Sequence, residues 1–225
     1  MPTLVSIPDQ RSFWNEWHGK HGATGEDQVH RVSRETFLRE LKGAGGDLSV
    51  LDLGCGQGHD VRRFAQAGYT VFGMDFSTEA IKRARRATPW IRWRRRQRTN
   101  LREHDITRRL PYPDHSFDGV FSHLALHYIT DEVTRRVFAD IERVTKPGGI
   151  LVFTVKSVAD SYCGKGDRIA NNVYCRKGHV RHFFSDDYAR ELLTGWAIQT
   201  IEHLEGHYAS HEPSNFILVV AVRKV

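Results

Sequence analysis

Short apolar runs alternate with helical segments through the middle of this 225-residue chain. Strands are expected at LSVLDLG (48–54), YTVFGMD (69–75), FDGVFSHLA (117–125) and GGILVFTVKS (148–157), with a weaker one at LREHD (101–105). Helices are expected between them at residues 60–68, 77–88 and 131–145, the second opened by a Ser77 cap. Alternation at this spacing predicts right-handed βαβ units and therefore a parallel sheet.

The two ends of the chain depart from this alternation. A helix at 185–195 is followed by two apolar segments, 196–206 and 214–224, with too short a stretch between them for a crossover helix. These segments are expected to pair as an antiparallel hairpin, whereas NAD-binding Rossmann domains normally continue in parallel. At the other end, residues 10–20 predict a short aromatic helix and residues 26–46 a second helix.

Positive charge is concentrated in one segment. The net charge is +6, yet residues 82–109 hold twelve Lys or Arg residues against two acids, so this segment carries +10 and the rest of the chain −4. With 40% hydrophobic residues the composition fits one globular domain, and no apolar run approaches the roughly 20 residues that span a bilayer. Three cysteines and the absence of a signal peptide favour a cytoplasmic protein with no membrane contact. Monomer and homodimer both stay open.

Three glycines, at positions 54, 56 and 58, follow a predicted strand in VLDLGCGQGHD (50–60). Glycine is needed where the backbone turns tightly and approaches a ligand without a Cβ in the way. A dinucleotide-binding G-x-G-x-x-G would need a further glycine where His59 or Val61 stands, and no Gly-Lys-Ser/Thr string follows. Asp52 lies inside the strand before the turn. A carboxylate there disfavours a bound pyrophosphate and favours an amino-acid ammonium.

VLDLGCGQG resembles the first motif of the class I S-adenosylmethionine-dependent methyltransferase superfamily, particularly its small-molecule, ubiquinone-methylase-like branch. VFGMD, HDI (104–106), LPYPDHSFDGVFSHLALHYI (110–129) and VTKPGGILVFTV (144–155) are similar to later segments of that family. The resemblance implies a Rossmann-like three-layer α/β/α sandwich with a seven-stranded, mostly parallel sheet and a C-terminal antiparallel hairpin. It also implies S-adenosylmethionine as cofactor, with Asp75 on the ribose hydroxyls and Asp105 on the adenine amine.

The resemblance implies a set of cofactor contacts and a division of the single domain, residues 1–225. The expected contacts are Asp52, Gly54, Cys55, Gly56, Gln57, Gly58, Asp75, Phe76, Asp105, Ile106 and Ser122. The expected parts are lid helices (1–45), a cofactor-binding core (46–157), a substrate-recognition loop (158–184) and a C-terminal helix and hairpin (185–225).

Methyl transfer needs alignment above all, and a base only where the acceptor arrives protonated. His127 is the first candidate base, because it follows the strongest strand and strand carboxyl ends bind ligands in α/β sheets. A histidine packed on the following turn is the alternative for His127, and His123 is the second candidate base. Trp14 and Trp17 are expected either to cover the site or to form an apolar helix face packed on the sheet.

The segment 161–184 is rich in cationic and hydrogen-bonding side chains, which suit an anionic or carboxylate-bearing substrate. The residues that give it this character are Tyr162, Lys165, Arg168, Arg176, His179, Arg181 and His182. A solvated loop is the alternative. A metal site is not expected, because Cys163 and Cys175 lie too far apart for a zinc knuckle.

Three functions remain in competition. The preferred one is methyl transfer to an N, O or S atom of a small, anionic metabolite. The second is RNA methylation through residues 82–109, where Trp90 and Trp93 lie among arginines, although a solvated basic face is the first interpretation of that segment. The third is a cofactor-binding regulator without catalysis. Neither an Asn-Pro-Pro-Tyr string nor a Pro-Cys pair occurs, which disfavours adenine-amine and pyrimidine-ring methylation.

Overall fold

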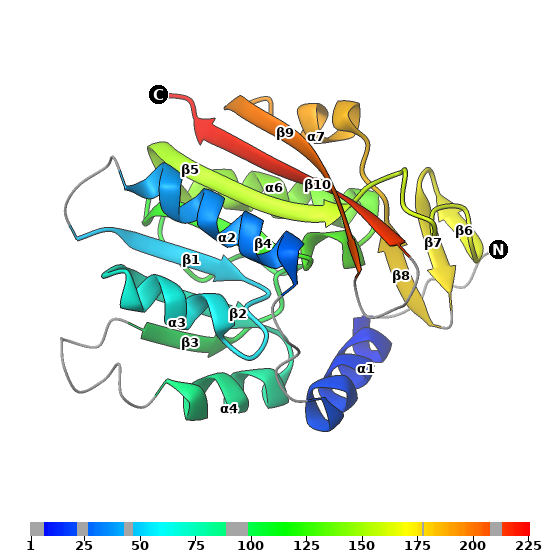
Figure 1. Ribbon diagram of the computed structural model, residues 1–225, viewed down its shortest axis with the longest axis horizontal. Coiled ribbons are helices and arrows are strands. Elements are labelled where there is room, and N and C mark those ends of the chain that lie inside the picture. Colours follow the sequence, from blue (N-terminus) through cyan, green and yellow to red (C-terminus); the bar gives the residue numbers. More distant parts are fainter. Residues whose placement is uncertain (1–6, 22–26, 43–46, 89–98, 177, 208–212) are drawn as a thin grey trace.

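The computed structural model describes residues 7–21, 27–42, 47–88, 99–176, 178–207 and 213–225. Their centre is a seven-stranded sheet in the order β3-β2-β1-β4-β5-β10-β9 (Figure 1). The strands are β1 (Ser49–Leu53), β2 (Thr70–Asp75), β3 (Thr99–Glu103), β4 (Phe117–His123), β5 (Thr145–Lys156), β9 (Trp196–His207) and β10 (Pro213–Arg223). The first five in chain order pair in parallel. β10 runs antiparallel to both β5 and β9, which confirms the expected terminal hairpin.

Helices cover both faces of this sheet, as a Rossmann-like three-layer sandwich requires (Figure 1). One face carries α2 (Gln28–Leu41), α3 (His59–Gln66) and α4 (Thr78–Ala87), and the other carries α6 (Asp131–Val144) and α7 (Asp186–Leu192). Each helix presents an apolar stripe because its hydrophobic residues recur at three- and four-residue steps. In α6 the buried stripe is Val137, Phe138, Ile141 and Val144. Ser77 caps α4 as expected, since its hydroxyl accepts the Ala80 N–H at 3.1 Å.

The segment expected as a recognition loop contains a small sheet of its own. Its three antiparallel strands are β6 (Asp167–Ala170), β7 (Val173–Arg176) and β8 (His179–His182). These strands are only four residues long and mix polar with apolar residues, so they are too short to show the apolar alternation by which strands are recognised in a sequence. The small sheet gives the side chains of this segment fixed positions.

The first helix, α1 (Ile7–Lys20), lies beyond the carboxyl ends of the parallel strands, beside α4 (Figure 1). The Oδ1 atom of Asn15 accepts the Ser77 hydroxyl at 2.7 Å. Arg83 of α4 donates to the carbonyls of Gly19 and His21 at 2.6 and 2.9 Å. α1 is therefore fastened to α4 rather than packed on the sheet. No helix in the described part of the chain is long and apolar enough to cross a membrane.

Candidate functional site

The glycine turn joins β1 to α3 through three residues in the left-handed region of the backbone, which favours glycine. Gly54, Gly56 and Gly58 have φ values of 73°, 50° and 77°. A Cβ on Gly54 would lie 2.2 Å from the Cβ of Ala125, and one on Gly58 would lie 2.9 Å from the Cβ of Ala84. The turn therefore combines left-handed backbone with close approach of two neighbouring segments.

Asp75 ends β2 beside this turn and is 7% exposed. Its Oδ2 accepts the Gly56 N–H at 3.0 Å and its Oδ1 accepts the Ser77 N–H at 2.8 Å. Burial raises the pKa of Asp75 to about 6, although these backbone hydrogen bonds favour the ionised form. A carboxylate oxygen accepts more than one hydrogen bond, so Asp75 retains capacity for two ligand hydroxyls. Phe76 follows it, with the Arg11 guanidinium 5.8 Å from its ring centroid.

Asp52 lies inside β1 with 2% of its surface exposed. Its Oδ2 is buried and has no hydrogen-bond partner among the described residues. Burial raises the pKa of Asp52 well above its usual value, and the neighbouring charges of Asp60 and Asp75 raise it further. A buried carboxylate without a partner is costly, so this position suits a ligand that brings a positive charge.

A buried group that the sequence analysis did not single out adjoins Asp52. His30 of α2 and Asp60 of α3 form a hydrogen bond of 2.6 Å between Nε2 and Oδ2, and Arg34 lies 3.8 Å from the other Asp60 oxygen. Burial lowers the pKa of His30, but the Asp60 hydrogen bond and charge outweigh it and the net shift is upward. The His30 ring stacks on His123 at 4.4 Å between centroids. No sequence motif links His30 and Asp60 to His123, the second candidate base, so only the fold reveals their contact.

Of the other residues expected at the cofactor, Asp105 and Ile106 lie beside Asp75, whereas Ser122 lies inside the sheet. Asp105 lies near Asp75, because the His104 N–H donates to the Asp75 carbonyl, and Ile106 follows it. The Oδ1 of Asp105 accepts the hydroxyl of Thr107 at 2.7 Å. Ser122 is fully buried in β4, and its hydroxyl donates to the Leu53 carbonyl at 2.9 Å, so that group is occupied within the sheet.

The two non-glycine residues within the turn differ: Cys55 is buried, and Gln57 forms hydrogen bonds to the end of α1. Cys55 is 8% exposed, and burial raises the pKa of its thiol well above the usual value. Gln57 donates from Nε2 to the His21 carbonyl at 3.0 Å and lies 3.4 Å from the Nδ1 of His18. Gln57 thereby ties the glycine turn to the C-terminal end of α1.

His127 lies on the short 3-10 helix η1 (Leu126–Tyr128), directly after β4. It is fully buried, and neither ring nitrogen has a hydrogen-bond partner among the described residues. Burial, followed by the positive charges of Lys156 and Arg181, lowers the pKa of His127 well below its usual value. The imidazole is therefore neutral, with one nitrogen able to accept a proton or a hydrogen bond.

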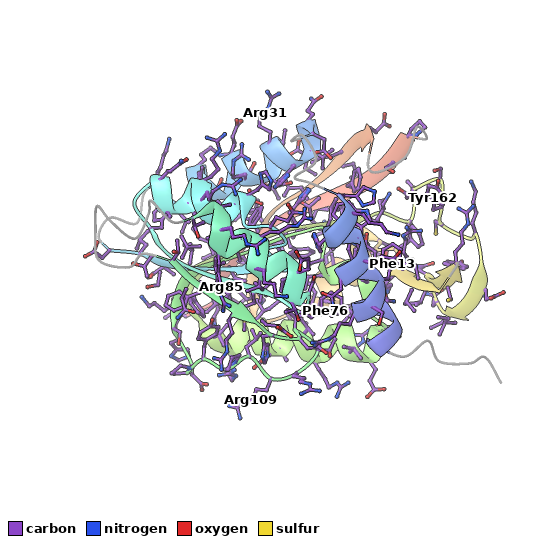
Figure 2. The ribbon with its side chains drawn as sticks, turned by 90° about the horizontal axis from the view of Figure 1, so that it is seen from below. Phe13, Arg31, Phe76, Arg85, Arg109 and Tyr162 are labelled. Carbon is purple, nitrogen blue, oxygen red and sulfur yellow. The ribbon has the colours of Figure 1, made fainter. Side chains whose placement is uncertain are left out.

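Trp14 connects α1 to η1 and to the small sheet. Its ring centroid lies 5.0 Å from Tyr128 and 6.2 Å from His179. Phe13 contacts His179 as well, and Figure 2 shows it on the side of α1 toward Tyr162. His179 is 8% exposed with both ring nitrogens unpartnered among the described residues, and burial lowers its pKa to about 4.

The remaining expected substrate contacts do not all face the same way. Trp17 stacks on His21 of its own helix end, with 5.0 Å between ring centroids. His182 lies 3.5 Å from the Thr134 hydroxyl and 4.6 Å from the Tyr188 ring, so it packs toward α6 and α7. Within the described ranges no three His, Cys, Asp or Glu side chains gather closely enough to hold a metal ion.

The basic segment 82–109 is described only at its two ends, because residues 89–98, with Trp90 and Trp93, lie outside the described residues. Arg83 holds the end of α1, and Arg85 donates to the Leu101 carbonyl at 2.9 Å. Arg85 and Arg109 lie well apart from Tyr162 in Figure 2. At least two of these arginines therefore hold the fold together instead of facing a partner.

Residues 51–153 match a family model described as a methyltransferase domain. A malonyl-[acyl-carrier protein] O-methyltransferase of Halorhodospira halophila is 38% identical over 46% of this chain and 33% of its own length. A 2-methyl-6-phytyl-1,4-hydroquinone methyltransferase of Synechocystis is 32% identical over 91% of this chain and 60% of its own. A tRNA N(3)-cytidine methyltransferase of Danio rerio is 25% identical over 82% and 53%. The chain thus spans a third to three fifths of these relatives.

The fold recurs in solved structures. A 1,6-didemethyltoxoflavin-N1-methyltransferase of Burkholderia thailandensis, with bound 1,6-didemethyltoxoflavin and S-adenosylhomocysteine, superimposes with a TM-score of 0.73. It is 19% identical, and the match covers 97% of this chain and 88% of that one. At this identity the likeness concerns the fold alone, and it confirms the Rossmann-like architecture with its terminal antiparallel hairpin.

Proposed function

Because the chain carries a methyltransferase domain of the class I S-adenosylmethionine-dependent superfamily, we propose that it transfers a methyl group from S-adenosylmethionine to a small acceptor. The acceptor atom is N, O or S, and the acceptor is an anionic metabolite. The bound cofactor supplies an activated methyl group on its sulfonium. The protein aligns the acceptor in line with that methyl and keeps water out.

The observation that carries this proposal is the pair of buried acids that flank the glycine turn. Asp52 has an unpartnered carboxylate oxygen, and Asp75 lies at the mouth of the turn with capacity for two hydroxyl donors. An ammonium and a ribose diol satisfy these two acids, whereas the phosphates of a nucleotide at the glycine turn would be repelled by the Asp52 carboxylate. We assign Asp52 to the amino-acid end of the cofactor, assisted by Asp60, and Asp75 to the ribose.

His127 is the group best placed to act on the acceptor. Its unpartnered ring nitrogens can accept a hydrogen bond, and then the proton, of an acceptor O–H, N–H or S–H as the methyl arrives. The lowered pKa keeps the ring neutral and also makes it a weaker base than a free imidazole. His123 is the second candidate, but it stacks on the His30 ring and has one buried, unpartnered Nδ1. A general base contributes about 10²- to 10⁴-fold in rate.

Labelled methyl transfer to a panel of acceptors tests both the activity and the role of His127. His127→Ala should lower kcat by about 10²- to 10⁴-fold and leave the affinity for adenosylhomocysteine unchanged. His203→Ala is the matched control, because His203 lies exposed on β9 beside Asp186, and it should keep full activity. A His127→Ala enzyme of normal rate would remove the base role.

RNA methylation is the second candidate, supported by the charge of residues 82–109 and by the tRNA methyltransferase among the relatives. The small-molecule acceptor is preferred because Arg83 and Arg85 bind main-chain carbonyls of their own fold. A cofactor-binding protein without catalysis is the third. Binding of adenosylhomocysteine without transfer to any acceptor would favour it.

A further inference from the structure

The ring of Tyr162 lies among four cationic side chains. The Lys165 ammonium and the Arg176 and Arg181 guanidinium groups lie 5.1, 4.9 and 5.7 Å from the ring centroid. The Lys156 ammonium lies 5.9 Å from it. These residues come from the end of β5, the turn after it, β7 and β8. We call Tyr162, Lys165, Arg176 and Arg181 the Tyr162 cluster.

The acid in direct contact with this group of side chains is already occupied. Asp160 is buried, and its Oδ2 pairs with Lys156 at 2.7 Å and accepts the Asn215 N–H at 3.0 Å. Its Oδ1 accepts the Tyr162 N–H at 2.9 Å. Asp160 therefore balances Lys156, which is 4% exposed, and fixes the backbone of Tyr162.

Two guanidinium groups of the Tyr162 cluster are left without an acid. Arg176 and Arg181 form no salt bridge with any acidic side chain in the part of the chain that the structure describes. Their contact is the face of Tyr162, which holds a cation but does not neutralise it. Like charges gathered around one ring repel each other, and an anion between them removes that repulsion.

The Tyr162 cluster lies at the acceptor side of the candidate site. Arg181 and His179 stand two residues apart on β8 and so share one face of that strand, and His179 contacts Phe13 of the lid. The charges of Lys156 and Arg181 also reach His127, because both lower its pKa. An acceptor anchored by this cluster would extend toward His127 and the end of β4.

We propose that the Tyr162 cluster binds the oxyanion of the methyl acceptor, a carboxylate or phosphate group, and orients the acceptor toward His127. The proposal rests on the proposed function and names its substrate class and its anchor. Arg176 and Arg181 each present a planar fork that pairs with two oxygens of such a group. Tyr162 keeps both forks in place when the anion is absent.

Direct binding of small anions tests the proposal without knowledge of the acceptor. Inorganic phosphate and acetate are titrated against the full chain at constant ionic strength, followed by phosphorus NMR and calorimetry. Wild type should bind at least one of them saturably, and Arg181→Gln and Arg176→Gln should each weaken that binding at least tenfold. Stronger phosphate binding identifies a phosphate-bearing acceptor, and stronger acetate binding a carboxylate-bearing one.

Arg168→Gln is the matched control. The sequence alone groups Arg168 with these cations, but in the structure it donates to the Ala170 carbonyl and the Asn171 side chain and does not belong to the Tyr162 cluster. It should bind as wild type does. Arg181→Lys keeps the charge without the fork and should show an intermediate affinity, which guards against a variant that misfolds. Equal anion affinity in wild type and Arg181→Gln, or no saturable binding in wild type, would overturn the proposal.

Adenosylhomocysteine binding is measured in the same samples, so that two failures stay distinct. If adenosylhomocysteine binds and phosphate and acetate ignore the Arg181 substitution, the anchor is wrong and the proposed function stands. If adenosylhomocysteine does not bind, the proposed function itself fails, and the anchor for a methyl acceptor fails with it.

Discussion

The proposed cofactor end of the site, made of Asp52, the glycine turn and Asp75, differs from the proposed acceptor end in the origin and the charge of its polar groups. Both oxygens of Asp75 receive backbone N–H donors, and Asp52 keeps one oxygen without a partner among the described residues. At the acceptor end, His127 and His179 keep buried ring nitrogens without a partner among the described residues. The acceptor end is assembled from α1, η1 and the small sheet, which are far apart in the chain. One end is built locally and is acidic, and the other is built from distant segments and is cationic.

This difference leads to a general point about such sites. The cofactor end depends on one backbone turn that requires glycine at set positions, and such a requirement is visible in the sequence as a motif. The acceptor end depends on side chains that the fold brings together from distant segments, and many different sequences can provide them. Substitutions at the two ends should therefore have separable effects, largest at the glycine turn.

Gly54→Ala should damage the cofactor end most. The new Cβ would lie 2.2 Å from the Cβ of Ala125 on a residue with φ of 73°. Overpacking and left-handed backbone together should cost about 2–4 kcal/mol of unfolding free energy, measured by urea denaturation. Adenosylhomocysteine affinity should fall with it.

Gly148→Ala separates the two causes. Gly148 has φ of 76° but nothing within 4 Å of its added Cβ, so it should lose about 1 kcal/mol from backbone strain alone. Equal losses of unfolding free energy in the two variants would contradict the conclusion that Ala125 packs closely against Gly54.

Asp75→Asn should weaken adenosylhomocysteine binding by about 1–3 kcal/mol, because a charge-assisted acceptor of the ribose hydroxyls is lost. The wild-type pKa of about 6 is raised above the usual value, so Asp75 is protonated below that pH and ionised above it. Cofactor affinity should therefore rise as the pH passes upward through 6. Calorimetry across this range should show a flatter profile for the variant, and an identical profile would remove Asp75 from the binding site.

Much of this architecture follows from the sequence, for reasons that lie in particular elements. β1, β2, β4 and β5 are continuous apolar runs because both faces of the sheet are covered. The short strands β6, β7 and β8 carry no such signal. They form a sheet because antiparallel neighbours satisfy one another's backbone groups.

The candidate site divides in the same way. The glycine turn and its acids are contiguous enough to form a motif, whereas His30, Asp60 and His123 meet only because α2 packs on the same face of the sheet as α3. Ser122 shows the opposite case. It lies in a segment that resembles a family motif, yet its hydroxyl donates to the Leu53 carbonyl. This hydrogen bond depends on the register between β4 and β1, which the sequence pattern does not show.

Trp14→Leu should affect the acceptor end alone. Trp14 contacts Tyr128 and His179, and losing these aromatic contacts should raise the KM for the acceptor about 2- to 10-fold at unchanged cofactor affinity. Trp17→Leu should change KM less, since Trp17 stacks on His21 of its own helix end. Steady-state kinetics measure the acceptor KM of both variants. A larger increase in KM for Trp17→Leu than for Trp14→Leu would assign the acceptor contact to Trp17 instead of Trp14.

The smallest effect is expected from RNA. If the basic segment is a solvated face, apparent RNA affinity should be weak and change little with salt, because few phosphates are neutralised. The measurement is the slope of log affinity against log salt concentration for a single-stranded RNA. A slope near −4 or steeper would indicate about six phosphate contacts and would make residues 82–109 an RNA-binding surface.

The most direct test of the account is calorimetric titration of the purified protein with adenosylhomocysteine, NAD and ATP in turn. The buried Asp52 should admit the ammonium of adenosylhomocysteine and disfavour the phosphates of NAD and ATP at the glycine turn, whereas Asp75 can accept the ribose of all three. Asp52→Asn should weaken adenosylhomocysteine binding, because the partner of its ammonium loses its charge. Uptake of NAD or ATP by a protein that ignores adenosylhomocysteine would contradict the assignment of the glycine turn and with it the proposed function.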